Sequence, residues 1–189
     1  MAALLIVWRH PRPVGVAGRC IGRTEVAVDR RKAKRLAHRI RQRARRESLP
    51  RVVWTSPLQR SADVGRFLAC WGWQHRVDLR LSELDFGDWD GRAWSVIGEA
   101  EVSAWTADFA THAPGGGESV AQLMSRCKAF LSEQGQQGGC VVSHAGWINA
   151  ARRVSAGLPV PTLATEWPAA VAYAASADLA IKPGGAESQ

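Results

Sequence analysis

The stretch "LLIVWRHPRP", residues 4–13, begins as the most apolar run of the chain and ends abruptly in charged and cyclic residues. A continuous run of large apolar side chains is typical of a strand that is buried on both faces of a parallel sheet. Arg9, His10 and Pro11 end that run within three positions. Either the strand simply leaves the core here, or it is a rigid support that holds His10 where a ligand can react with it.

Short apolar runs alternate with longer helical patterns along the rest of the chain. The sequence predicts strands at 3–8, 51–54, from 76, at 138–144 and within 171–181, and helices at 30–46, 56–70, 94–109, 118–134 and 146–156. Such alternation favours an α/β fold with a mainly parallel sheet that is covered by helices on both faces. We expect residues 1–182 to form a single domain and residues 183–189 to form a flexible C-terminal tail.

Composition excludes several classes of protein. The 189 residues are 46% hydrophobic and 22% charged, which is typical of a soluble globular chain and not of a disordered one. No run reaches the roughly 20 apolar residues of a membrane helix, so we expect no membrane partner and a cytoplasmic location. The four cysteines are scattered, and we expect packed thiols without disulfides or metal ligation: Cys20, Cys70, Cys127 and Cys140.

The net charge of +8 comes from one segment. Residues 30–46 hold ten Lys or Arg and no acid, and the remaining fifteen basic and seventeen acidic residues carry a net charge of −2. Apolar residues recur within this segment at helical spacing: Ala33, Leu36, Ala37, Ile40 and Ala44. We expect a helix with Asp29 as its N-cap and a solvated outer face. The alternative is a surface for RNA or an anionic membrane.

Polar residues that can bind phosphate follow three of the predicted strands. Arg9 and His10 follow the first strand, "TSPLQR" (55–60) with Arg60 follows the second, and His144 follows "CVVS". Because loops at the carboxyl ends of parallel strands converge on one crevice, we expect these side chains to meet there.

Two histidines and two arginines suit phosphoryl transfer. Guanidinium groups match phosphoryl oxygens and stay charged, and we expect a helix that opens at Ser56 and Pro57 to add free backbone N–H groups. One neutral imidazole can attack phosphorus, and a second, protonated imidazole can balance charge on the transferring group. Glu83, in a loop just beyond a strand, can supply a proton as a carboxyl that burial or a nearby phosphate keeps neutral.

Five segments in order resemble the histidine phosphatase superfamily, also called phosphoglycerate-mutase-like. They are "RHP" (9–11), "TSPLQRS" (55–61), "LSELDFGDWDG" (81–91), "GGES" (116–119) and "VSHAG" (142–146). Each motif alone is weak, but their order and spacing agree with the family from residue 4 to about residue 155.

The resemblance implies a three-layer α/β/α sandwich and a role for each residue. His10 would be the nucleophile that becomes phosphohistidine, and Arg9, Arg60 and His144 would form the phosphate pocket. Glu83 would be the acid that protonates the leaving group and later the base for water. The substrate would be a small phosphate monoester, and no metal or other cofactor would be needed.

Three positions depart from the family pattern. Pro11 and Ala145 replace glycines, and Val16 stands where the family often has an asparagine that contacts phosphate. We expect Arg23, in "CIGR" (20–23), to take over as a substrate-binding cation, and Ala145 to line the same site.

The start of the chain resembles the alpha-ribazole phosphatase branch, which acts in cobalamin biosynthesis. That resemblance rests on residues 9–28, and we expect the pocket walls to come from residues 20–28 and 92–113. The alternatives are a phosphomutase, which the short spacing of 61 positions between Glu83 and His144 disfavours, and a non-enzymatic protein that binds RNA or an anionic surface through residues 30–46. We regard nucleic acid as the less favoured partner.

Several other features have simpler interpretations. We expect the nine tryptophans to serve in the core or in pocket walls and residues 115–117 to form a flexible turn. We expect Asp85, Asp88 and Asp90 to be surface acids. The oligomeric state stays open, with a homodimer as one option.

Overall fold

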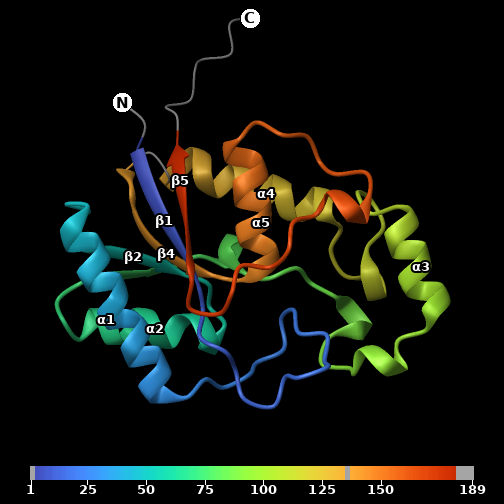
Figure 1. Cartoon of the computed structure of the whole chain (residues 1–189), viewed down its shortest axis with the longest axis horizontal. Coiled ribbons are helices and arrows are strands. Elements are labelled where there is room, and N and C mark those ends of the chain that lie inside the picture. The colour runs from blue at the N-terminus through green and yellow to red at the C-terminus, as the bar shows by residue number, and fades with distance from the viewer. Residues whose placement is uncertain (1–2, 135–136, 182–189) are drawn as a thin grey trace, which may run out of the picture.

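The computed structural model describes residues 3–134 and 137–181. The expected C-terminal tail, 183–189, lies outside the described residues. Within them the chain forms a five-stranded sheet with helices on both faces (Figure 1).

The sheet has the order β3-β2-β4-β1-β5. Its strands are β1 (Ala3–Arg9), β2 (Val52–Thr55), β3 (Gln74–Val77), β4 (Gly139–Ser143) and β5 (Ser176–Ile181). The three pairs β1–β4, β2–β4 and β2–β3 are parallel, and β5 pairs with β1 in the antiparallel direction. The predicted α/β class with a mainly parallel sheet is confirmed.

Helices cover both faces of this sheet. They are α1 (Arg30–Arg46), α2 (Gln59–Ala69), α3 (Glu99–Ala107), α4 (Val120–Gln134) and α5 (Ala145–Ser155). Leu5 and Val7 of β1 belong to the core with α4 and α5, whereas Ile6 and Trp8 belong to the core with α1 and α2. Because both sets of β1 side chains are buried, the strand is apolar without alternation. Helix α3 stands apart from the sheet (Figure 1).

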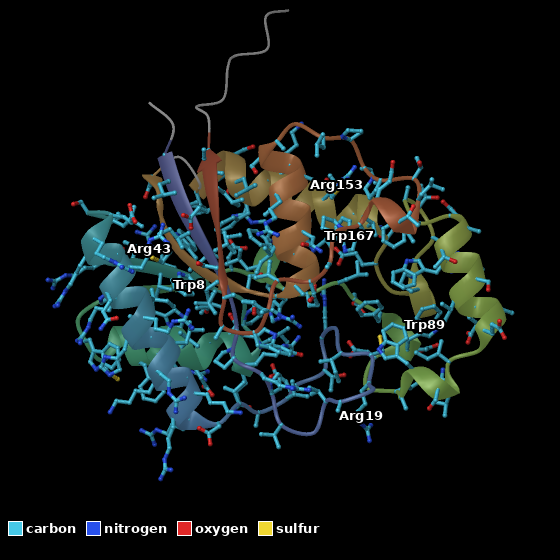
Figure 2. The ribbon with its side chains drawn as sticks, in the orientation of Figure 1. Trp8, Arg19, Arg43, Trp89, Arg153 and Trp167 are labelled. Carbon is cyan, nitrogen blue, oxygen red and sulfur yellow. The ribbon has the colours of Figure 1, made fainter. Side chains whose placement is uncertain are left out.

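The basic helix α1 packs as its spacing predicts. The five apolar residues of its stripe are at most 3% exposed: Ala33, Leu36, Ala37, Ile40 and Ala44. Asp29 caps the helix by accepting a hydrogen bond from the backbone N–H of Lys32 at 3.0 Å. Most of the cations face outward, and the side chains on α1 extend into solvent in Figure 2.

Four predicted boundaries are wrong. The helix expected from residue 56 begins only at Gln59, and the helix expected at 94–109 divides at Gly98 into a 3₁₀ turn, Trp94–Val96, and α3. The strand predicted from residue 76 ends at Val77 and gives way to a 3₁₀ turn at Leu79–Leu81. The strand predicted within 171–181 starts only at Ser176, because Ala174 takes a left-handed backbone conformation with φ of 59° and turns the chain.

The thiols of Cys20, Cys127 and Cys140 are buried, as expected, whereas the expectation of a packed thiol is wrong for Cys70, which is exposed. Among the described helices, none is long and apolar enough to cross a membrane.

Candidate active site

The two histidines meet at the carboxyl ends of two neighbouring strands. His10 follows β1 and His144 follows β4, and the centroids of their imidazole rings are 5.0 Å apart. The parallel pairing of these strands continues one step further, since the backbone N–H of His10 donates to the Ser143 carbonyl at 3.0 Å. The predicted convergence of these two residues is therefore a consequence of the β1–β4 pairing.

The tautomer of His10 follows from its contact with Pro11. Nδ1 lies 2.7 Å from the Pro11 carbonyl oxygen, which can only accept, so Nδ1 carries the proton and Nε2 keeps its lone pair. Burial, followed by the charge of Arg60, lowers the pKa of His10 well below its ordinary value. The imidazole is therefore neutral at neutral pH. Because the carbonyl makes the contact, proline serves here as well as glycine.

His144 is fully buried, and both of its ring nitrogens have protein partners. Arg60 Nε donates to Nδ1 at 3.2 Å, so Nδ1 is unprotonated and Nε2–H donates to the Ser56 hydroxyl at 2.7 Å. Burial and the charge of Arg60 lower the pKa of His144 well below its ordinary value. The expectation of a protonated second imidazole is therefore wrong for this structure, because a buried ring beside a guanidinium is held neutral.

Arg60 is a buried cation without a carboxylate partner. Its side chain is 1% exposed and donates to the backbone carbonyls of Gly22 and Thr24, the latter at 2.8 Å. Among the described residues no carboxylate lies within ion-pair distance of it. A buried charge without a counter-charge is costly, so the arrangement favours binding of an anion.

The start of α2 does not offer the free N–H groups that we expected at Ser56 and Pro57. The helix begins later, and the backbone N–H of Gln59 donates to Glu25 Oε2 at 2.9 Å. A carboxylate of the protein therefore occupies the N-terminus of this helix.

Asp90 organises the loop that holds Arg60. Its carboxylate accepts from the backbone N–H groups of Gly22, Arg23 and Thr24, and the Thr24 hydroxyl donates to it at 2.5 Å. The interpretation of Asp90 as a surface acid is wrong, because its carboxylate is half-buried and binds these donors of residues 22–24. Asp88 is exposed as expected.

Glu83 lies at the N-terminus of α5. Its Oε2 accepts from the backbone N–H of Gly146 at 3.1 Å, and Oε1 accepts from those of Trp147 and Leu84 at 3.3 and 3.1 Å. Three backbone N–H donors therefore hold the Glu83 carboxyl group at the start of α5. The side chain is 8% exposed and faces a cavity.

That cavity has a volume of about 550 Å³ and borders Arg9, Glu83, Ala145 and Gly146. Six aromatic side chains line it beyond these residues: Phe86, Trp94, Trp105, Phe109, Trp167 and Tyr173. In Figure 2, Trp167 and Trp89 lie on the side of α3, far from Arg43 on α1. The predicted pocket wall at 92–113 is present, as is Ile21 from the predicted 20–28 segment.

Not every expected site residue reaches this cavity. Arg9, Glu83 and Ala145 line it, whereas His10, Arg60, His144 and Arg23 are not among its lining residues. The Arg23 guanidinium lies 3.6 Å from Asp85 and 3.8 Å from Glu118, and its contact with substrate stays a prediction.

The glycine segment 115–117 is a tight contact and not a flexible turn. A Cβ added at Gly115 or Gly117 would overlap the backbone of Asp85 or Phe86, so only glycine permits the approach of the two loops.

Sequence reasoning missed the contribution of the segment before β5. Tyr173 lines the cavity, and its ring centroid lies 5.6 Å from that of His10. Arg19 also lines the cavity, and its Nη1 donates to the Gly91 carbonyl at 2.9 Å. The spacing of residues along the chain held no signal for Tyr173, because it is brought to the site by the pairing of β5 with β1.

The fold and this arrangement define an α/β site that gathers two histidines and two arginines at one edge of a mainly parallel sheet. The chain matches the family model of the histidine phosphatase superfamily (branch 1) over residues 5–187, and it belongs to that superfamily.

Individual relatives agree with this assignment. The chain is 33% identical over 137 residues to a glucosyl-3-phosphoglycerate phosphatase of Mycobacterium tuberculosis, a match that covers 64% of this chain and 59% of that protein. A structure of the mycobacterial glucosyl-3-phosphoglycerate phosphatase in complex with VO3 matches with a TM-score of 0.74 at 28% identity, over 94% of this chain and 92% of that one. The alpha-ribazole phosphatase of Shigella flexneri matches in fold, with a TM-score of 0.74 at 23% identity over 98% of this chain and 100% of that one.

Proposed function

We propose that this protein is a metal-independent phosphomonoesterase that acts through a phosphohistidine at His10. The observation that carries the proposal is the neutral His10: its Nδ1 donates to the Pro11 carbonyl, so Nε2 keeps its lone pair, and burial and the charges of Arg60 and Arg9 lower its pKa. Neither of these guanidinium groups pairs with a carboxylate among the described residues. Arg9 Nε is buried and unpartnered among those residues, which suits an anion-binding group. A related protein whose structure holds VO3 supports the same interpretation, because vanadate is an analogue of phosphate.

The proposed reaction has two steps. First, Nε2 of His10 forms a bond to phosphorus while the bond from phosphorus to the alcohol oxygen breaks, and Glu83 in its protonated form gives its proton to that oxygen. Then a water molecule attacks phosphorus, Glu83 takes the proton of the water, and the bond between phosphorus and His10 breaks. Arg9 and Arg60 balance the charge of the phosphoryl oxygens in both steps.

The role of His144 differs from the one that the family resemblance implies. Its Nδ1 accepts from Arg60 and its Nε2–H is directed to Ser56, so it positions the Arg60 guanidinium. We propose that it contacts phosphate only after Arg60 turns toward the anion and Nδ1 takes up a proton, because an unprotonated nitrogen cannot donate to a phosphate oxygen.

The cavity of about 550 Å³ is lined by aromatic side chains and favours a phosphate ester whose alcohol carries a flat apolar group. The indole and phenyl rings of Trp94, Trp105 and Phe109 suit an aromatic heterocycle better than a hydroxyl-rich sugar. We therefore propose alpha-ribazole 5′-phosphate, a benzimidazole nucleotide, ahead of a glucosyl-phosphoglycerate. The fold likeness to the Shigella protein is compatible with this choice.

Two alternatives remain distinct from this proposal. A phosphomutase would have to protect phosphohistidine from water until a second hydroxyl binds. An RNA- or surface-binding protein would use α1, whose residues do not line the cavity, so its binding would be independent of His10.

The test uses the purified full chain and a panel of phosphate monoesters with EDTA present. We expect release of phosphate from aryl phosphates and most efficiently from alpha-ribazole 5′-phosphate, and loss of turnover in His10→Ala. Transfer of the phosphoryl group within the substrate, without release, would indicate a mutase. Salt-sensitive RNA binding without any phosphatase activity would reject the proposal in favour of the α1 surface.

A further inference from the structure

The turn before β5 holds the backbone of Arg9 on both sides. The Arg9 N–H donates to the Ala175 carbonyl at 2.9 Å, and the Ala174 N–H donates to the Arg9 carbonyl at 3.1 Å. This turn therefore fixes the position of β1's last residue, directly before the candidate nucleophile.

The same turn also fixes the Arg9 side chain. Nη1 donates to the Val171 carbonyl at 2.7 Å, and Cζ lies 3.7 Å from the centroid of the Tyr173 ring. A guanidinium that is stacked on an aromatic face at this distance gains cation–π attraction while it keeps its in-plane N–H groups for other partners. One edge of the guanidinium is thus bound and one face is covered.

The Nε edge of the Arg9 guanidinium is separate from its contacts with Val171 and Tyr173. Nε is buried and has no hydrogen-bond partner among the described residues. A buried N–H donor without a partner is rare in proteins, and at a candidate phosphate site it indicates where the ligand oxygen binds.

The backbone of this turn is strained. Ala174 has φ of 59°, a left-handed conformation that is unfavourable for a residue with a Cβ. Arg39 of α1 holds the strained turn from outside, since its Nη1 donates to the Ala174 carbonyl at 3.0 Å. Contacts on both sides therefore keep Tyr173, the single tyrosine of the chain, over Arg9.

We propose that Tyr173 is a positioning residue for phosphoryl transfer, whose ring holds the Arg9 guanidinium with its Nε edge toward the phosphoryl group. The inference rests on the proposed function, because it takes a phosphoryl group as the ligand of Arg9. Tyr173 acts through Arg9 and needs only its ring, not its hydroxyl.

The first test compares Tyr173→Leu with the conservative Tyr173→Phe. We expect Tyr173→Leu to raise both KM for an aryl phosphate and the inhibition constant of inorganic phosphate about 5- to 10-fold, with a smaller effect on kcat. Tyr173→Phe keeps the aromatic face, so both constants should stay within about twofold of those of the parent chain. Arg39→Lys weakens the contact that holds the turn from outside but keeps the tyrosine ring, so it should raise both values by less than Tyr173→Leu does.

The second test is a double-mutant cycle with Arg9→Lys. A lysine has no planar group to stack, so Tyr173→Leu should add little to the loss that Arg9→Lys already causes. Thermal unfolding with and without inorganic phosphate shows whether each variant is folded and how strongly the anion stabilises it.

The outcomes separate this inference from the proposed function. Three results would overturn the positioning role. Tyr173→Leu could change KM equally in the parent chain and in the Arg9→Lys variant, or change it in neither. Tyr173→Phe could also raise KM as much as Tyr173→Leu does. Full turnover of His10→Ala would instead overturn the phosphohistidine mechanism, whatever the Tyr173 variants do.

Discussion

Gly146 and Glu83 are in such close contact that a Cβ at position 146 would have to displace the Glu83 carboxylate. The Gly146 N–H donates to Glu83 Oε2 at 3.1 Å, and a Cβ added to Gly146 would overlap Glu83 Oε1. Gly146 of the "VSHAG" motif is therefore needed to leave room for the Glu83 carboxylate. Ala145, the residue before it, is not restricted in this way.

Gly146→Ala should displace the carboxylate and remove most of its contribution as acid and base. We expect kcat to fall about 100-fold for alkyl phosphates, which need a proton at the leaving oxygen, and less for p-nitrophenyl phosphate, whose leaving group needs none. Steady-state kinetics on both substrates measures the difference.

Gly157→Ala is the matched control for Gly146→Ala. Gly157 lies just beyond the other end of α5 with φ of 69° and open space around it. The alanine should lower the melting temperature through backbone strain while kcat stays unchanged. An equal loss of kcat on both substrates in Gly146→Ala would contradict a specific role of Glu83 in proton transfer.

The pH dependence of stability follows from the two buried histidines. Burial lowers the pKa of His10 and of His144 below the ordinary value of 6.5, so below pH 6.5 the unfolded chain binds protons that the folded chain does not. Stability should therefore be complete above pH 6.5 and fall on acidification, with a slope of about 1.4 kcal/mol per pH unit for each histidine.

Thermal unfolding between pH 7.5 and 5.5 checks this slope. His10→Asn removes one titrating group and should make the melting temperature less dependent on pH. A slope identical to that of the parent chain would show that His10 is not held neutral in the folded state.

Asp90→Asn should weaken the loop that holds Arg60. The Asp90 carboxylate accepts hydrogen bonds from several donors of residues 22–24 with two oxygens, whereas the amide of the variant has only one acceptor oxygen. We therefore expect the free energy of unfolding to fall by about 2 kcal/mol. KM for phosphate esters should rise as well, because the carbonyls of Gly22 and Thr24 orient Arg60. Denaturant unfolding and kinetics measure the two effects.

Asp88→Asn provides the comparison for Asp90→Asn, since Asp88 stands two positions earlier and is exposed. We expect it to match the parent chain in stability and KM. Equal losses in both variants would mean that the net charge of this segment matters and the Asp90 contacts do not.

Trp94→Ala tests whether the aromatic cavity binds the leaving group. Trp94 lines the cavity and is 41% exposed, so its removal should cost little stability. We expect KM for naphthyl phosphate to rise about fivefold, which corresponds to about 1 kcal/mol, and KM for glycerol phosphate to stay unchanged. An equal change for both substrates would place the leaving group elsewhere.

Local patterns were sufficient where neighbours along the chain decide the structure. The apolar stripe of α1, the doubly buried β1 and the mainly parallel sheet follow from side-chain period and from strand–helix alternation. The closeness of His10 and His144 was also predicted, because loops at the carboxyl ends of parallel strands converge on one crevice.

Only the tertiary structure decided how the charged groups are oriented. The Arg9 side chain donates to the carbonyl of Val171, 162 positions away in the chain. The Arg60 side chain donates to a loop whose backbone N–H groups bind the Asp90 carboxylate. Such contacts depend on which loops the sheet order brings together, and residue spacing carries no record of that order. The sequence by itself determined which residues can carry the chemistry, whereas the packing of distant loops decided which atoms of those residues remain free to bind an anion.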